Sequence, residues 1–343
     1  MAIRGLTVCL FLAFATCRVP AEEPETFLVP HALKPGDTIA LIAPSAPATN
    51  PEFSSYVKLM EGKGFRVIGK PGLVGRKEHY LGGSDAERAL EINEYLRDPK
   101  VRMIMPVRGG FGMTRILDRI DFKALRKDPK IIAGYSDLTA LHLGAARHAQ
   151  VVTFHSPMAM RDLWREAEPS YAFQARSFNQ AVFAGQYRLG QRGYVVEIPE
   201  GDRPEKLVGG KAKGRLLGGN LSLVVTLMGT SHAMQPKGAI LFLEDVSEPA
   251  YRIDRYLSQL RLAGVMDQVA GVMLGSFTTS DKGEEKDTTR VLKDYFGKLK
   301  VPVLMGFAVG HTTRNATLPH GAMVELDADE GTLRVLENPV RLE

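Results

Sequence analysis

Short aliphatic segments alternate with segments of helical periodicity along the first half of the chain, and this alternation limits the folds that the chain can adopt. The aliphatic segments are predicted strands at residues 37–43, 64–68, 101–107 and 131–134. Between them, residues 52–63 and 84–96 carry apolar side chains at helical spacing. Strands that alternate with helices favour a parallel sheet with helices on both faces.

The second half of the chain alternates in the same way. Residues 161–205 mix aromatic, glycine and polar residues, so we interpret them as a connector, with a helical pattern at residues 172–183. Further strands and helices are predicted at residues 216–228 (helix), 238–243 (strand), 253–263 (helix), 269–274 (strand), 288–299 (helix) and 301–307 (strand), with a closing hairpin at 323–336. The sequence therefore predicts an α/β fold of two domains, namely an N-terminal parallel-sheet domain at residues 33–160 and a C-terminal α/β domain at residues 206–343 with its own sheet.

The N-terminus has the pattern of an export signal. Arg4 supplies a positive charge, and residues 6–15 form an apolar run that is too short to span a bilayer. We therefore expect residues 1–21 to be a signal segment and the mature protein to lie in the cell envelope or periplasm, with no transmembrane span. An alternative is a lipoprotein with Cys17 as the lipid carrier.

Composition argues against several classes of function. Both cysteines, Cys9 and Cys17, lie in or next to the apolar run of the predicted signal segment, so we expect no cysteine catalysis and no cysteine metal site. The formal net charge is +5, without a stripe of Lys and Arg interleaved with aromatic residues, so we expect no nucleic-acid partner. No pair of histidines has metal-ligand spacing with an acid, so we expect no metal.

Ser136 lies between the predicted strand at residues 131–134 and a predicted helix at residues 138–148. A sharp strand-to-helix turn lifts a side chain clear of the backbone and directs the helix N-terminal N–H groups at what that side chain attacks. Serine is also favoured as a helix N-cap. Both interpretations stay open on this segment alone, because a serine nucleophile needs a base and an oxyanion site from elsewhere.

The glycine-rich segment 108–112 directly follows a predicted strand. Ligands of an open parallel sheet bind beyond the carboxyl ends of its strands, and Ser136 follows such an end too. The N–H of Gly109 or Gly110, paired with that of Asp137, could form an oxyanion hole. An ordinary tight turn and a phosphate-binding loop are the alternatives, although no Gly-Lys-Ser/Thr follows.

Two further segments carry groups that could serve a serine nucleophile. Glu244 and Asp245 follow a predicted strand, where one acid could orient a histidine; capping a helix or pairing with an arginine is the alternative. His311 lies in a polar loop and could act as a general base, although a surface histidine is the commoner case. The competitors for that role are His142, His148, His155, His232 and His320.

Together these segments resemble the LD-carboxypeptidase family of serine peptidases, which includes murein tetrapeptide carboxypeptidases and microcin C immunity peptidases. The matching motifs are Arg108-Gly109-Gly110-Phe111-Gly112, Gly134-Tyr135-Ser136-Asp137, Phe242-Leu243-Glu244-Asp245, Gly310-His311 and Leu318-Pro319-His320-Gly321. Each motif is weak alone, but their order and spacing over residues 33–336 are specific.

The resemblance implies a role for each matching residue. The implied nucleophile from the first domain and the charge-relay pair from the second are Ser136, Glu244 and His311. The implied oxyanion N–H groups are those of Gly109, Gly110 and Asp137. Arg108 is, by its position, a candidate to bind the terminal carboxylate of the substrate.

The resemblance also implies a reaction, the hydrolysis of the amide bond between an L-residue and a C-terminal D-amino acid. We expect release of D-alanine from murein tetrapeptides by a homodimer that needs no metal or other cofactor. The alternatives are a microcin C-type immunity peptidase and an exported solute-binding protein. The third residue of the stem peptide, lysine or diaminopimelate, stays open.

Overall fold

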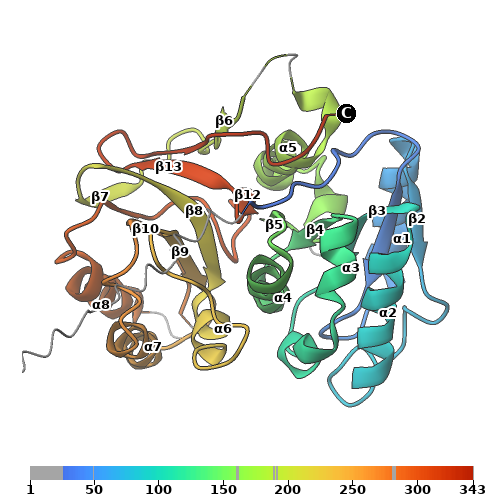
Figure 1. Cartoon of the computed structure of the whole chain (residues 1–343), viewed down its shortest axis with the longest axis horizontal. Helices are drawn as coiled ribbons and strands as arrows, with labels where there is room; N and C mark the ends of the chain where they lie inside the picture. The colour runs from blue at the N-terminus through green and yellow to red at the C-terminus, as the bar shows by residue number, and fades with distance from the viewer. Residues whose placement is uncertain are drawn as a thin grey trace, which may run out of the picture.

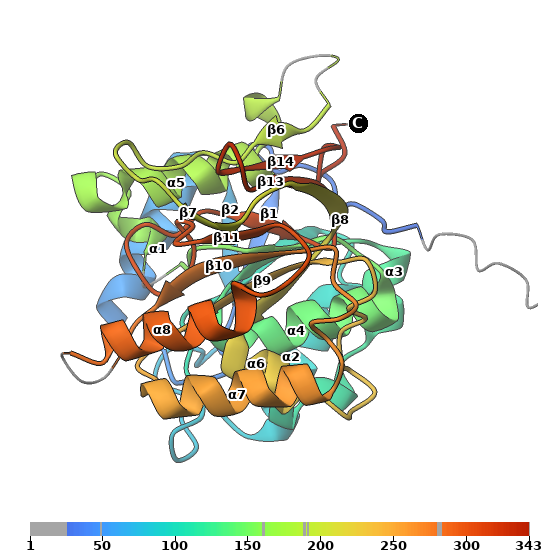
Figure 2. The same cartoon turned by 90° about the vertical axis from the view of Figure 1, so that its left-hand side faces the viewer.

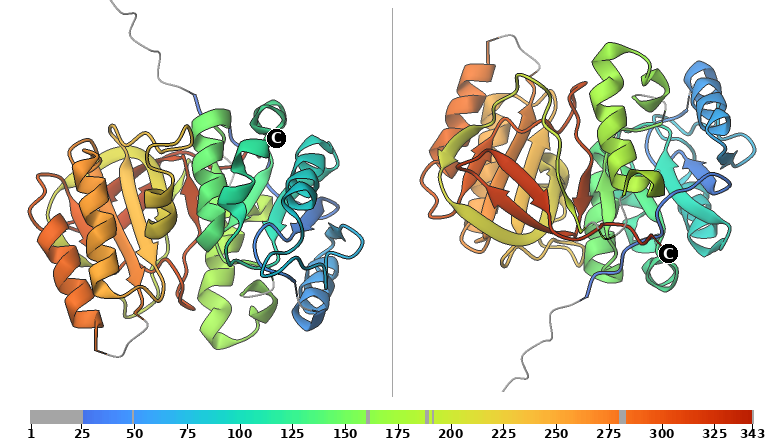
Figure 3. Two further views of the ribbon diagram at one scale, coloured as in Figure 1. Left: turned by 90° about the horizontal axis from the view of Figure 1, so that it is seen from below. Right: turned by 90° about the horizontal axis from the view of Figure 1, so that it is seen from above.

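The computed structural model describes residues 26–48, 50–159, 162–187, 190, 192–279 and 283–342. Two β-sheets stand side by side with helices around them (Figure 1), so the predicted α/β fold with two sheets is confirmed. Views from below and from above show that each sheet has its own helices packed beside it (Figure 3). The predicted signal segment and both cysteines lie outside the described residues. No helix in the described part of the chain is both long and apolar enough to span a bilayer.

The first sheet has the strand order β12-β5-β4-β3-β1-β2. Its strands are β1 (Thr38–Ile42), β2 (Arg66–Gly69), β3 (Val101–Pro106), β4 (Ile131–Gly134), β5 (Thr153–His155) and β12 (Leu318–His320). The strands from the first half of the chain are parallel, as predicted, whereas β12 pairs antiparallel with β5 at the edge. The sequence prediction missed β5, although residues 151–154 are β-branched or aromatic and so typical of a strand, and it missed β12, whose Pro319 is atypical of one.

The second sheet has the strand order β6-β14-β13-β8-β9-β10-β11-β7. Its strands are β6 (Tyr194–Val195), β7 (Glu205–Val208), β8 (Lys211–Asn220), β9 (Ile240–Asp245), β10 (Gly271–Phe277), β11 (Val303–Met305), β13 (Met323–Asp327) and β14 (Thr332–Val335). Strands β8 to β11 are parallel neighbours, and antiparallel strands flank them on both sides. The predicted closing hairpin is confirmed as β13 and β14.

Helices cover both faces of the first sheet. The α-helices of the described residues are α1 (Asn50–Gly62), α2 (Asp85–Arg97), α3 (Phe122–Lys127), α4 (Thr139–Gly144), α5 (Pro169–Val182), α6 (Leu221–Thr226), α7 (Ala250–Leu262) and α8 (Glu285–Phe296). Alternate residues of a strand point to opposite faces. Accordingly, Ile39 and Leu41 pack with α1 and α5, whereas Ala40 and Ile42 pack with α2, α3 and α4. Helices α7 and α8 lie side by side along one face of the second sheet (Figure 2).

The predicted helix at residues 216–228 is wrong at its start. Residues up to Asn220 belong to β8, and α6 begins at Leu221, where the Asn220 side chain caps it. Strand β8 lies so close to β9 that a Cβ on Gly218 would stand 1.9 Å from the Phe242 carbonyl oxygen. The glycine in this segment therefore permits a close approach of two strands and does not mark a turn before a helix.

Segments that are far apart in the sequence join the two halves. Residues 161–205, predicted as a connector, contain α5, which the helical pattern predicted, and β6 of the second sheet. Strand β12 returns from the second half of the chain to the edge of the first sheet. Phe154 of β5 and Phe242 of β9 belong to one hydrophobic cluster. This shared core fixes the carboxyl ends of β4 and β9 relative to each other.

Candidate active site

Ser136 begins a short 3₁₀ turn, Ser136–Leu138, between β4 and α4, so the predicted strand-to-helix junction is confirmed. Its φ of +63° is one that residues other than glycine adopt rarely and at a cost in free energy. The turn and α4 have no side-chain N-capping hydrogen bond, and Ser136 Oγ instead lies 2.9 Å from His311 Nε2. The N-cap interpretation of Ser136 is therefore wrong.

His311 links Ser136 with Glu244. Its Nδ1 lies 2.7 Å from Glu244 Oε2, while its Nε2 faces Ser136 Oγ. The Glu244 side chain is fully buried, and only 7% of the His311 side chain is exposed. The structure thus brings together side chains from the end of β9, the loop after β11 and the turn after β4.

The loop that carries His311 approaches β9 closely. Gly310 has a φ of +122°, and a Cβ there would stand 2.3 Å from Ser276 Oγ and 2.9 Å from Glu244 Oε2. Asn315 is buried, and its Oδ1 accepts a hydrogen bond from the Gly310 N–H at 3.0 Å. Because glycine alone fits this position, Gly310 and Asn315 determine where the imidazole lies.

The buried ring of Tyr135 packs against the His311 imidazole. The two ring centroids are 4.7 Å apart, with planes inclined by 60°. A tilted contact of this kind is favourable and limits how far the imidazole can turn. Tyr135 is part of the motif around Ser136, but no local pattern in the sequence indicates which ring it contacts.

The glycine-rich loop after β3 lies against Ser136. A Cβ on Gly109 would stand 3.3 Å from Ser136 Oγ, and one on Gly110 would stand 2.7 Å from the Ala46 side chain. The Asp137 N–H follows Ser136 directly, and the first N–H groups of a helical segment have no acceptor within it. The backbone of Gly109 and that of Asp137 therefore both lie next to the serine oxygen. Arg108 is exposed at the start of this loop.

Asp245 has a different environment from that of Glu244. Its Oδ1 accepts a hydrogen bond from Asn220 Nδ2 at 3.0 Å, and its Oδ2 accepts one from the Ser222 N–H at 2.9 Å. Burial, together with the nearby charge of Glu244, raises the pKa of Asp245 to about 6. Asp245 thus joins the end of β9 to the start of α6, while Glu244 faces the imidazole.

The competing histidines lie in other environments. His142, His155 and His320 are fully buried, and burial lowers the pKa of each, that of His142 to about 4. His148 and His232 contact each other at 2.9 Å near the surface. Among the described residues, no group of three or more His, Cys, Asp and Glu side chains is placed to hold a metal.

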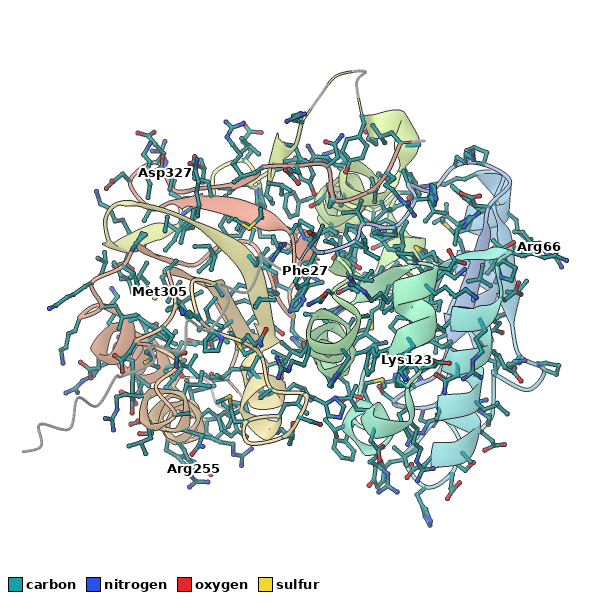
Figure 4. The ribbon with its side chains drawn as sticks, viewed as in Figure 1. Phe27, Arg66, Lys123, Arg255, Met305 and Asp327 are labelled. Carbon is teal, nitrogen blue, oxygen red and sulfur yellow. The ribbon has the colours of Figure 1, made fainter. Side chains whose placement is uncertain are left out.

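A cavity of about 810 Å³ lies away from the serine, at the other end of α4. The residues that line it include Phe27, Leu143, Arg147, Lys213, Arg215 and Met323. Phe27 lies between the two halves of the molecule (Figure 4), and the Arg215 guanidinium stands 4.2 Å from its ring centroid. None of the described residues that line this cavity is Ser136, Glu244 or His311, so this cavity is separate from the serine site.

Both halves of the chain match known peptidase domains. Residues 39–156 match the LD-carboxypeptidase N-terminal domain, and residues 213–326 match the LD-carboxypeptidase C-terminal domain. These domains define a serine-type peptidase. The chain belongs to the LD-carboxypeptidase family, so the predicted resemblance is confirmed and a solute-binding protein is no longer a candidate.

Similar proteins cover most of the chain. The probable murein peptide carboxypeptidase of Bacillus subtilis is 34% identical over 307 residues, which are 88% of this chain and 92% of that protein. The microcin C7 self-immunity protein MccF of Escherichia coli is 32% identical over 329 residues, which cover 88% of this chain and 94% of that protein. A solved structure of MccF in complex with aspartyl sulfamoyl adenosine has a TM-score of 0.81 at 28% identity, and the match covers 92% of this chain and 100% of that one. The solved structure of muramoyltetrapeptide carboxypeptidase from Oxalobacter formigenes has a TM-score of 0.73 at 28% identity, and the match covers 87% of this chain and 97% of that one.

Gly310→Ala should lower peptidase activity about 100-fold, because the added Cβ displaces the His311 loop from Glu244, and a misplacement of about 1 Å has an effect of that size. The matched control is Gly306→Ala, where φ is also positive, at +78°, and nothing lies within 4 Å of the added Cβ. Initial rates on one peptide substrate compare the two variants, with circular dichroism to verify folding. Equal rates would contradict the prediction.

Proposed function

We propose that this protein is a serine carboxypeptidase that hydrolyses the amide bond between an L-residue and a C-terminal D-amino acid, and that it releases D-alanine from murein tetrapeptides. The series of contacts from Ser136 through His311 to Glu244 supports this most directly, because such a series activates a serine for acyl transfer. Relatives named murein peptide and murein tetrapeptide carboxypeptidase support the substrate class.

His311 is the general base in this mechanism. Its Nδ1–H donates a hydrogen bond to Glu244 Oε2, so that Nε2 accepts one from the Ser136 hydroxyl. Nε2 takes the hydroxyl proton while Oγ attacks the carbonyl carbon of the scissile bond. The buried Glu244 carboxylate holds the imidazole in this tautomer and stabilises the imidazolium that forms.

Backbone N–H groups bind the oxyanion that develops on the carbonyl oxygen. The proposed donors are the N–H of Asp137 and that of Gly109 or Gly110. In comparable sites the loss of one such donor raises the activation free energy by roughly 3 kcal/mol. The donors belong to packed backbone, so they need little reorganisation when the charge forms.

The tetrahedral intermediate collapses as its C–N bond breaks, and His311 returns the proton to the amine of the leaving D-alanine. A water molecule, deprotonated by His311, then hydrolyses the acyl group on Ser136. Arg108 is the proposed partner of the terminal carboxylate of the substrate, because it is exposed at the start of the loop that borders Ser136.

A microcin C-type immunity peptidase is the second candidate. It is supported by the TM-score of 0.81 to MccF in complex with aspartyl sulfamoyl adenosine, against 0.73 to the muramoyltetrapeptide carboxypeptidase. The same acyl transfer would act on an amide bond of a peptide–nucleotide antibiotic. The value of kcat/KM on a murein tetrapeptide, compared with that on an aminoacyl sulfamoyl nucleoside, separates the candidates, and we expect the tetrapeptide to give the higher value.

We also propose that the protein is exported to the cell envelope after removal of residues 1–21, with lipidation at Cys17 as the alternative, and that it is a homodimer. The N-terminal sequence pattern supports export, and the family resemblance supports the dimer. Fractionation of cells that produce the full chain tests the location, and analytical ultracentrifugation tests the dimer. An exported enzyme would meet intact murein or its released fragments.

Ser136→Ala should lower the release of D-alanine from a murein tetrapeptide at least about 10³-fold, because it removes the nucleophile. The control is Ser84→Ala, which removes the N-cap hydrogen bond of α2 and should cost about 1 kcal/mol of stability without loss of activity. Amino-acid analysis of the products measures the release. Undiminished release by Ser136→Ala would exclude this nucleophile.

Glu244→Gln should lower kcat about 10²- to 10⁴-fold with little change in KM, because a neutral amide does not stabilise the imidazolium. Asp245→Asn, in the adjacent position, is the control and should lower kcat less than about 10-fold, since Asp245 faces α6. Steady-state kinetics on the tetrapeptide measure both variants. A larger effect from Asp245→Asn would reverse the proposed assignment.

A further inference from the structure

Asp137 directly follows the proposed nucleophile, and its side chain is buried. Only 1% of the residue is exposed, so its carboxylate is out of reach of a substrate. One carboxylate oxygen, Oδ2, accepts two hydrogen bonds, from Ser45 Oγ at 2.5 Å and from the Met113 N–H at 2.7 Å. The other oxygen, Oδ1, has no hydrogen-bond partner among the described residues.

These two hydrogen bonds reach the loops of two other strands of the first sheet. Ser45 lies in the loop after β1, and Met113 ends the glycine-rich loop after β3, while Asp137 itself follows β4. Strands β4, β3 and β1 are successive neighbours in that sheet. One oxygen atom therefore fixes three neighbouring loops to one another at the carboxyl edge.

The two partner loops also contact each other beside Ser136. The Ala46 N–H donates a hydrogen bond to the Gly109 carbonyl oxygen at 3.3 Å, and the backbone of Gly110 packs against the Ala46 side chain. A shift of the Ser45 loop would therefore move Gly109 and Gly110. The backbone of these glycines supplies one half of the proposed oxyanion site, and the N–H of Asp137 supplies the other half.

A buried arginine supports the same arrangement. Arg88 is fully buried and donates hydrogen bonds to the carbonyl oxygens of Pro44 and Gly112, one in each partner loop. Its charge favours the ionised form of Asp137, but burial has the larger effect and raises the pKa of Asp137 to about 6. Above that pH the ionised carboxylate disfavours the folded state. A buried carboxylate that disfavours folding is a candidate for a functional role.

We propose that the Asp137 carboxylate is a positioning residue, which sets the separation between its own N–H and the N–H groups of Gly109 and Gly110 by holding the loops after β1 and β3. This role rests on the proposed function of the site. Stabilisation of the oxyanion depends directly on that separation, whereas Arg108, the proposed partner of the substrate carboxylate, precedes the two glycines and donates nothing to the oxyanion. A change at Asp137 therefore acts on kcat and not on KM.

Asp137→Asn tests this role at constant size. The rate at which a fluorophosphonate labels Ser136 should fall about 10- to 100-fold, because the phosphonyl oxygen of the probe occupies the oxyanion site. On the tetrapeptide, kcat should fall by a similar factor while KM stays within about threefold. The melting temperature at pH 8 should not fall, because the amide carries no buried charge. A purely structural role predicts the reverse, a lower melting temperature with unchanged rates.

Ser45→Ala is the second variant, since it removes one of the two donors and leaves Asp137 in place. It should slow labelling about 3- to 10-fold. The control is Asp121→Asn, at a carboxylate that likewise accepts a backbone N–H, that of Ala124, but at the N-cap of α3; its labelling rate should equal that of the wild type.

Wild-type labelling rates in Asp137→Asn would overturn this assignment. If Asp137→Asn does not fold, wild-type labelling in Ser45→Ala overturns it, and slower labelling in Ser45→Ala supports it. Labelling requires no murein peptide, so the substrate is tested separately. A wild-type protein that labels at Ser136 but releases no D-alanine would contradict the proposed substrate and leave the comparison of labelling rates intact.

Discussion

The buried contact between Glu244 and His311 is the interaction on which the rest of the site depends. A carboxylate that is fully excluded from water is unfavourable unless it is paired, and the 2.7 Å contact with Nδ1 supplies a partner for Oε2. It also leaves Nε2 directed at a serine that belongs to the other sheet. The imidazole can face both partners only while the two sheets keep their relative positions. The hydrophobic core that contains Phe154 and Phe242 maintains these positions.

Unfavourable local features gather around this contact. Ser136 has a left-handed backbone conformation, and Asp137 and Asp245 are buried carboxylates whose pKa values burial raises to about 6. Each of these features disfavours folding, and each lies at the carboxyl edge of a sheet. The surrounding apolar strands provide the stability that tolerates them. Such a concentration is expected where a site has been selected for reactivity and not for stability.

The sequence predicted the elements whose pattern is long enough to have a period. The strands β1, β3 and β9 and the helices α2 and α7 were found in this way, whereas β12, which has three residues and contains Pro319, was not. Ser136 could be placed at a strand-to-helix junction, but its partner histidine could not be chosen from local pattern, because His311 and His320 both lie in polar segments. Contacts in the folded chain separate them, because His311 faces Ser136 and Glu244, whereas the fully buried His320 accepts a hydrogen bond from the Gly218 N–H. The contact of Asp137 with Ser45 joins residues 92 positions apart, so no local signal in a single sequence indicates it.

Strand β12 has a consequence for the newly made chain. The first sheet has an open edge at β5 until residues 318–320 leave the ribosome, and an unpaired strand edge is prone to non-native pairing. His311 is made only shortly before those residues. The nascent protein therefore carries its serine without an imidazole partner for most of its synthesis. A chain that ends before these residues therefore lacks both the edge strand of the first sheet and the imidazole partner of Ser136.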